Sequence, residues 1–281
     1  METKKDINKL IIDNYSNLKP SLFFLPVFLL IAIVFFLYNE NALSSDAYIK
    51  IQTKTFFFIN YYLGQDPDLQ FNLTQLGDDL IFLSLLSILI MYAPKIWESL
   101  ISSLLLSLVF SCLLKKIFAV PRPAAVFDHS SFVIVGKALS GHTSLPSGHS
   151  ITIFAILTIL LFALMPSKSG YRILWSFFVI LTGSVLVFTR VGIGAHYPLD
   201  VIIGGIIGYL LGLAGIFISR KYKIWTWIND KRYYPIFILL FLICSIALIG
   251  RIMAENLVIY YLSLVSLMIS LYKTITIYVK K

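Results

Sequence analysis

Long runs of apolar residues, separated by short polar breaks, constrain the fold of this chain more than any other feature. Of its 281 residues, 58% are hydrophobic and 13% are charged. A soluble domain carries roughly a quarter charged residues. A membrane-spanning helix needs about 17–25 mostly apolar residues, and runs of that length recur along the chain. The sequence therefore predicts an all-α fold, a polytopic transmembrane helical bundle.

Eight segments are predicted to span the membrane. Their approximate ranges are 22–38, 76–93, 99–117, 148–165, 173–189, 198–218, 235–250 and 256–272. The second has a short uncharged core, Leu80 to Ala93, and it spans only if its helix begins before Asp78 and Asp79. The first apolar run, Ser21 to Tyr38, lacks a clear small-residue cleavage site and is predicted to be an uncleaved signal anchor.

The formal charge of +9 is distributed unevenly over this predicted topology. If the N-terminus is cytoplasmic, the inside segments hold Lys4, Lys5, Lys9, Lys19, Lys95, Lys168, Arg172, Arg220, Lys221, Lys223, Lys231, Arg232, Lys273, Lys280 and Lys281. The outside segments hold only Lys50, Lys54, Lys115, Lys116, Arg122, Lys137, Arg190 and Arg251. This is the positive-inside bias of membrane proteins, so the basic charge indicates orientation, and no nucleic-acid partner is predicted.

Small residues give two further expectations about packing. Gly204, Gly208 and Gly212 recur every four residues, which predicts a smooth helix face for close contact, and Asp200 lies one step earlier on that face. Asp200 should therefore point into the bundle, where a carboxylate needs partners. The two cysteines, Cys112 and Cys244, lie inside apolar spans without metal-ligand spacing, and both are predicted to be small core residues.

The longest polar segment, residues 39–75, is predicted to lie outside, between the first two spans. Within it, Ala47 to Leu63 is rich in Phe, Tyr and Ile, with Lys50 and Lys54 interspersed. This pattern fits an amphipathic helix on the membrane surface, and it fits equally a folded loop packed on the helix ends. The sequence leaves both interpretations open.

Three short polar stretches interrupt the apolar sequence, each near the end of a predicted span. They are Lys115 with Arg122-Pro123, Pro146-Ser147-Gly148-His149, and Thr189-Arg190 with His196 and Asp200. The span count places all three on the same outside face. Their three cations, two imidazoles and one carboxylate are side chains that can hold a phosphate group, attack it and protonate its leaving group.

In the third stretch, His196 and Asp200 are one helical turn apart, with Pro198 between them. Proline is favoured at the first position of a helix, so a helix is predicted to begin there. Asp200 then lies in the first turn, where its carboxylate can accept a hydrogen bond from one imidazole nitrogen and leave the other free to attack. The carboxylate would also stabilise the positive charge that develops on the ring.

The second stretch precedes a predicted span and is expected to form the N-terminus of that helix. Backbone N–H groups at a helix N-terminus, together with the Ser147 hydroxyl, make an anion site. Gly148 would let a phosphate approach the backbone closely. His149 would then act as a general acid on the leaving oxygen.

The cations Lys115, Arg122 and Arg190 are expected to surround the phosphoryl oxygens, because a guanidinium fork binds two oxygens at once. The remaining histidines, His129 and His142, have no acidic cluster nearby. Neither is predicted to be essential, and no metal site is predicted.

Together the three stretches resemble the motifs of the type-2 phosphatidic acid phosphatase superfamily, which includes bacterial integral-membrane lipid phosphate phosphatases. Lys115 precedes Arg122-Pro123 by seven residues, His196 follows Arg190 by six, and Asp200 follows His196 by four. The one departure is Thr189, where the family pattern has serine. With their flanking helices, the motifs cover roughly residues 75–218.

The resemblance implies a lipid phosphate phosphatase that needs no metal ion or other cofactor. It implies that His196 is the nucleophile and forms a phosphohistidine, that Asp200 orients it, and that His149 protonates the leaving group. The residues that would hold the phosphate are Lys115, Arg122, Ser147, Gly148 and Arg190. The expected partners are a lipid phosphate and the bilayer, and the expected place is a bacterial inner membrane with the site on the periplasmic or extracellular face.

The resemblance also implies a six-helix phosphatase core, predicted over residues 1–218, plus a C-terminal transmembrane helix pair, predicted over residues 219–281. The pair could shape a lipid access groove, contact a second copy, or simply pack, and the sequence does not choose among these roles. The oligomeric state is also left open.

Substrate and acceptor are open as well. Phosphatidylglycerol phosphate, phosphatidic acid, undecaprenyl pyrophosphate and lipid A phosphates all present the same group, and transfer to another lipid would use the same intermediate. A transporter fits less well, because the charged residues gather at span ends instead of near the membrane midplane. A non-catalytic scaffold fits less well, because it should have lost His196, His149 or one of the cations, and all of these are present. Vanadium-dependent haloperoxidases have similar motifs, but they are soluble.

Overall fold

The computed structural model describes residues 2–279, which form helices and short turns without a strand. The helices are α1 (Glu2–Ser16), α2 (Phe24–Asn39), α3 (Ser45–Leu63), α4 (Pro67–Thr74), α5 (Asp79–Leu86), α6 (Leu89–Tyr92), α7 (Pro94–Phe118), α8 (Pro123–Val126), α9 (Gly148–Ala163), α10 (Ser169–Gly192), α11 (Pro198–Lys221), α12 (Tyr234–Glu255) and α13 (Val258–Val279). Six helical segments in this range are long and apolar enough to cross a membrane: Pro20–Asn39, Pro94–Val126, Ser169–Gly192, Pro198–Lys221, Lys231–Glu255 and Val258–Val279. The predicted all-α polytopic bundle is therefore confirmed.

The span predicted over residues 76–93 is wrong as a single helix. A 3-10 turn (Gln75–Gly77), α5 and α6 take its place. Asp78 caps α5 by accepting a hydrogen bond from the Leu80 N–H at 2.9 Å, and the helix stops where the Ser87 hydroxyl donates to the Ser84 carbonyl at 2.7 Å. Serine competes in this way with the helical hydrogen bonds of its own backbone. Pro94 ends α6, because the residue before a proline is driven out of the helical region.

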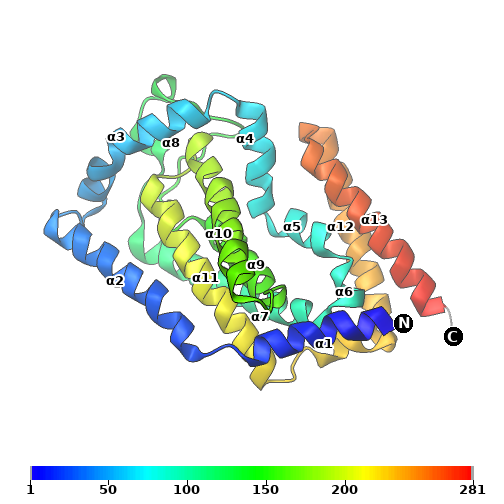
Figure 1. Ribbon diagram of the computed structural model, residues 1–281. Helices are drawn as coiled ribbons and strands as arrows, with labels where there is room; N and C mark the ends of the chain where they lie inside the picture. The colour runs from blue at the N-terminus through cyan, green and yellow to red at the C-terminus, as the bar shows by residue number, and fades with distance from the viewer. Residues whose placement is uncertain (1, 280–281) are drawn as a thin grey trace.

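The helix over the predicted span 148–165 is also shorter than predicted. α9 has 16 residues, one turn less than most membrane spans, and is largely buried among the other helices. It is the central helix of the bundle, flanked by α7, α10 and α11 (Figure 1).

The chain nevertheless crosses from one end of the bundle to the other over residues 77–95, where the second span was predicted. The end at which α9 and α11 begin is the site end, and α1 lies across the opposite end, against α7 and α9 (Figure 1). Gly77 is at the site end, since a Cβ on it would lie 2.6 Å from the His149 Cβ. Lys95 is at the opposite end, where its N–H donates to Asn8 Oδ1 at 3.1 Å. Residues 77–95 therefore connect the two ends, although as broken helix.

The predicted glycine face of α11 is confirmed. A Cβ on Gly204 would lie 2.7 Å from the carbonyl oxygen of Ser147, the N-cap of α9. A Cβ on Gly212 would lie 2.7 Å from the carbonyl oxygen of Ala155 in α9. Gly208 approaches the Ile151 carbonyl in the same way, so the four-residue step of α11 follows a four-residue step along its partner. Close contact at this face fixes the start of α11 beside the start of α9.

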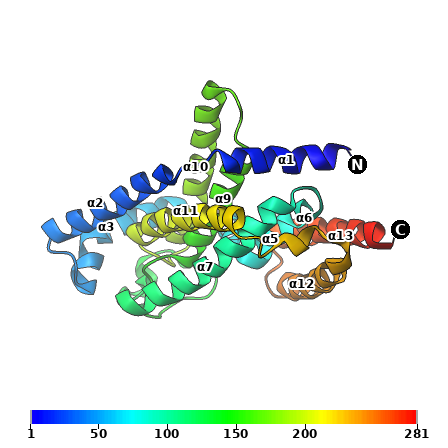
Figure 2. The same ribbon diagram turned by 90° about the horizontal axis from the view of Figure 1, so that it is seen from below.

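The C-terminal helices α12 and α13 lie side by side at one edge of the bundle, away from α2 and α3 (Figure 2). They pack on α5. At the other edge stands α2, and an apolar cavity of about 720 Å³ lies between α2, α7 and α11.

One of the two cysteine predictions is wrong. Cys112 is exposed on α7, whereas Cys244 is half-buried. The predicted inside cations Lys280 and Lys281 lie outside the described residues.

Candidate active site

All three polar stretches converge at the site end of the bundle. Lys115 lies in the last turn of α7, and Arg122 follows in the loop before α8. Gly148 and His149 begin α9, and Arg190 lies in the last turn of α10. His196 and Asp200 lie just before and inside the first turn of α11, which begins at Pro198 as predicted. The structure thus brings every predicted site residue into one region.

The imidazole of His196 is held between a carboxylate and a guanidinium. His196 Nδ1 lies 3.5 Å from Asp200 Oδ2, and Nε2 lies 3.4 Å from Arg122 Nη1. Both side chains of the pair are buried, His196 with 1% and Asp200 with 0% of its surface exposed. Nδ1 is on the side of the carboxylate, although it makes no hydrogen bond among the described residues, and Nε2 is on the side of the cations. This is the orientation that a nucleophilic imidazole needs.

Burial, together with the charge around His196, favours the neutral form of its ring. Burial first, and then the nearby cations Arg122 and Arg190, hold the pKa of the His196 imidazole well below its usual range. A lowered pKa means that the ring is unprotonated at neutral pH, so its lone pair is available to an electrophile.

The three cations contact neighbouring segments of the site end. Arg122 donates to the Ala195 carbonyl at 3.3 Å, next to His196. Arg190 donates to Thr74 Oγ1 at 3.2 Å, and its buried Nε has no hydrogen-bond partner among the described residues. Lys115 Nζ lies 3.1 Å from where a Cβ on Gly148 would be, so glycine lets the ammonium group approach the N-terminus of α9. The site therefore presents three cations to an anion.

The start of α9 forms as predicted. Ser147 is the N-cap, and its buried hydroxyl accepts a hydrogen bond from the Ser150 N–H at 3.4 Å. The Ser147 N–H itself donates to the Asp200 carbonyl at 3.1 Å, which ties the second motif to the third. Gly148 and His149 are less buried than Ser147 and contribute the accessible part of this helix end.

Two other residues of the third stretch have structural roles. Thr189, which replaces the serine of the family pattern, uses its hydroxyl within α10, where Oγ1 donates to the Leu186 carbonyl at 2.6 Å. Gly194 has a φ of +76°, and a Cβ on it would lie 2.5 Å from the Val133 carbonyl oxygen. Glycine is needed at this turn because of both its left-handed backbone and the close approach.

Residues that the sequence did not single out complete the surroundings of Asp200. Tyr48 on α3 donates its hydroxyl to Asp200 Oδ1 at 2.7 Å, and Ser144 donates to Oδ2 at 2.5 Å. The Tyr197 N–H also donates to Oδ2, at 3.0 Å. Burial first, and then the negative charge of Asp200, raises the pKa of the Tyr48 phenol, so its hydroxyl remains a donor. The carboxylate of Asp200 therefore accepts three hydrogen bonds from residues other than His196.

Tyr48 belongs to a stripe of buried, mostly polar residues on α3. This stripe bears on the two interpretations of segment 39–75, a helix on the membrane surface or a loop packed on the helix ends. Tyr48, Gln52, Phe56 and Asn60 are buried at four-residue intervals. Gln52 accepts a hydrogen bond from the Leu199 N–H at 3.0 Å, and Asn60 donates to the Val191 and Gly192 carbonyls at 3.0 Å. Residues 45–63 of the segment thus form a helix, α3, which packs on the site loops instead of lying only on a membrane surface.

Replacing Tyr48 by phenylalanine is expected to lower kcat about tenfold, because the change removes one hydrogen bond to a charged group and leaves Asp200 less firmly oriented. Phosphate release from a lipid phosphate measures the effect, and the thermal midpoint reports folding. Tyr62→Phe, at an exposed tyrosine of the same helix, is the matched control. An unchanged kcat in Tyr48→Phe would show that this hydroxyl does not support the site.

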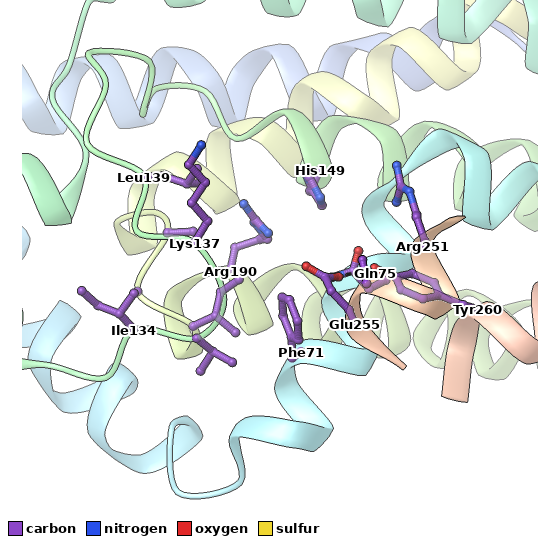
Figure 3. A pocket seen from close by; sticks show the side chains of 15 residues that line it. Phe71, Gln75, Ile134, Lys137, Leu139, His149, Arg190, Arg251, Glu255 and Tyr260 are labelled. Atoms are coloured by element: carbon purple, nitrogen blue, oxygen red, sulfur yellow. Dashed lines mark hydrogen bonds between the residues drawn. The ribbon is translucent and has the colours of Figure 1, made fainter. Parts of the chain in front are cut away.

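A pocket of about 370 Å³ opens beside the cations and reaches the C-terminal helix pair. Figure 3 shows His149 and Arg190 with Arg251, Glu255 and Tyr260 around the same space. His129 and His142 are both exposed and are not among the residues that line this pocket. Within residues 2–279, no group of three or more His, Cys, Asp or Glu side chains is placed to hold a metal ion.

A membrane-type helical bundle with two histidines, a buried carboxylate and three cations at one end defines a candidate phosphoryl-transfer protein. Residues 97–224 match the model of the PAP2 superfamily, and this segment contains all three motifs. The resemblance to the type-2 phosphatidic acid phosphatase superfamily is therefore confirmed over this segment.

The crystal structure of Aquifex aeolicus LpxE is similar to this chain, with 24% sequence identity and a TM-score of 0.49. The similarity covers 59% of this chain and 95% of that one. No curated protein matches the chain in sequence.

Proposed function

We propose that this chain is an integral-membrane lipid phosphatase that removes a phosphate from a lipid phosphate or pyrophosphate headgroup through a phosphohistidine on His196. The observation that carries the proposal is the placement of the His196 ring, with Nδ1 on the Asp200 side and Nε2 among the cations. The family match supports the substrate class.

In the first step, the lone pair of His196 Nε2 attacks the phosphorus atom. The Nε2–P bond forms as the P–O bond to the lipid breaks, and the electron pair leaves on the lipid oxygen. Burial first, and then the cations Arg190 and Lys115, hold the pKa of the His149 imidazole well below its usual range. The negative charge of a bound phosphate acts in the opposite direction, and His149, protonated in that complex, gives its proton to the lipid oxygen. Asp200 stabilises the positive charge on the His196 ring, while Lys115, Arg122, Arg190 and the N-terminus of α9 with Ser147 and Gly148 stabilise the phosphoryl oxygens.

In the second step, His149 is neutral and takes a proton from water as the water oxygen attacks phosphorus. The Nε2–P bond breaks, its electron pair returns to His196, and inorganic phosphate leaves. The two histidines thus return to their starting protonation states, and no step of this sequence requires a metal ion or another cofactor.

We also propose that the site end faces the outside of a bacterial inner membrane. The opposite end, where α1 lies, carries the cations Lys9, Lys95, Lys168 and Arg220 next to helix ends. This distribution agrees with the positive-inside bias and supports a cytoplasmic position for that end.

The test is phosphate release by the purified full-length protein from a panel of lipid phosphates, with and without EDTA. The panel contains phosphatidic acid, phosphatidylglycerol phosphate, a prenyl pyrophosphate and a lipid A phosphate. We expect release from at least one of them at the same rate in EDTA. Release that stops in EDTA would contradict the metal-free mechanism. Loss of phosphate from the donor lipid only when a second lipid is present, with the phosphate recovered on that second lipid and not in solution, would indicate phosphoryl transfer instead of hydrolysis.

A further inference from the structure

The pocket beside the phosphate site has a wall that comes from outside the family match. Arg251 and Glu255 lie at the end of α12, and Tyr260 lies at the start of α13, beyond residues 97–224. The opposite wall includes His149 and Arg190 (Figure 3). The turn between α12 and α13 therefore contributes polar side chains to the space next to the proposed general acid.

Arg251 is held in this wall by defined contacts. Its Nη2 lies 2.9 Å from Asp78 Oδ2, and its guanidinium lies over the Tyr260 ring at 6.0 Å from the centroid. Tyr260 in turn donates its hydroxyl to Glu255 Oε2 at 2.7 Å. These contacts orient the guanidinium group and use only some of its five N–H donors.

The anchor of Arg251 is adjacent to the catalytic region. Asp78 follows Gly77, and a Cβ on Gly77 would lie 2.6 Å from the His149 Cβ. Arg251, Asp78, Gly77 and His149 thus form a continuous series of contacts along the pocket. The nucleophile His196 lies beyond the cations and is not part of the pocket wall.

The position of His149 indicates which part of a substrate reaches Arg251. In an in-line displacement the leaving group lies opposite the attacking atom, and here it would lie on the His149 side. The same side holds Arg251, with the exposed Lys137 on the loop wall of the pocket. Three cations line the pocket, Lys137, Arg190 and Arg251, against one carboxylate, Glu255. This excess of positive charge in the pocket favours an anionic leaving group.

We propose that Arg251 forms an anion subsite for a second phosphate in the leaving group of the substrate. The preferred substrate class is then a lipid diphosphate, in which the bond that breaks joins the two phosphates. A guanidinium fork suits this role because it binds two phosphate oxygens at once. This inference rests on the proposed function, and it gives the C-terminal helix pair a part in substrate selection.

The experiment compares a prenyl diphosphate with the matching prenyl monophosphate as substrates of the full-length protein. The quantity measured is the ratio of kcat/KM for the diphosphate to kcat/KM for the monophosphate. In Arg251→Gln this ratio is expected to fall about tenfold, which is the size of effect that loss of a hydrogen bond to a charged group produces.

Two variants separate charge recognition from packing. Asp78→Asn breaks the same ion pair but keeps the Arg251 charge, and asparagine can still cap α5. It is expected to lower the ratio by less than Arg251→Gln does, because the Arg251 charge stays in the pocket wall although its anchor is weakened. Arg232→Gln removes a cation near the other end of α12, where the side chain is 83% exposed, and it controls for a general effect of charge. It is expected to retain the wild-type ratio.

The outcomes are distinct. A fall in the ratio in Arg251→Gln that exceeds the fall in Asp78→Asn and is absent in Arg232→Gln supports the subsite. An unchanged ratio in Arg251→Gln, with kcat/KM for both substrates either kept or lowered together, or an equal fall of the ratio in Arg232→Gln, would show that Arg251 does not bind the second phosphate. Either result would overturn the subsite while leaving the phosphatase intact. No phosphate release from either substrate by the wild-type protein would overturn the proposed function, and the subsite with it.

Discussion

Replacing His196 by alanine is expected to reduce phosphate release about 10³-fold or more, since the change removes the attacking atom itself. His196 is buried between Asp200 and Arg122, and no other described histidine shares this arrangement. Release of inorganic phosphate from the best substrate of the panel measures the loss. His142→Ala, at an exposed histidine six residues before the start of α9, is the matched control and is expected to keep the wild-type rate.

The same variant also tests the covalent intermediate. A lipid labelled with ³²P in the reactive phosphate should transfer acid-labile radioactivity to the wild-type protein in a rapid quench, and none to His196→Ala. Phosphate release that continues in the variant at the wild-type rate would show that another group, or water directly, attacks the phosphorus.

Replacing His149 by alanine is expected to lower the rate about 10²–10⁴-fold on a lipid phosphate, the usual range for loss of a general acid. The loss should be much smaller with 4-nitrophenyl phosphate, because nitrophenolate leaves without being protonated. The control is His129→Ala, because His129 is exposed and its Nε2 contacts only the Ala124 carbonyl, at 2.9 Å. Equal losses of His149→Ala on both substrates would mean that His149 positions the phosphate but does not donate the proton.

Local spacing was sufficient to predict the helix ends that carry the site. Pro198 begins α11 and Ser147 caps α9, because proline and serine favour these positions whatever the rest of the fold does. The four-residue spacing of Gly204, Gly208 and Gly212 also predicted the close packing of α11, because small residues at this spacing let another helix backbone approach. These features follow from a few neighbouring residues.

Contacts between distant segments could not be predicted in the same way. Tyr48 and Asp200 are 152 residues apart in the sequence, and nothing near Tyr48 marks it as a partner of a carboxylate. Positions 48, 52, 56 and 60 do share one helix face and are buried. The polar residues at this four-residue spacing are therefore a sequence signal for a buried, hydrogen-bonded face of this helix. The break at Ser87 in the predicted second span was likewise hidden, because serine is compatible with both a continuous and a broken helix.

The polar stripe of α3 has a consequence for how the protein is made. Asn60 binds backbone carbonyls that are 131 and 132 residues later in the chain, and Tyr48 binds a carboxylate later still. During synthesis α3 therefore emerges well before α10 and α11 exist to satisfy its hydrogen-bonding groups. The candidate site can therefore be completed only after the start of α11 has been made, and its assembly joins an early and a late part of the chain.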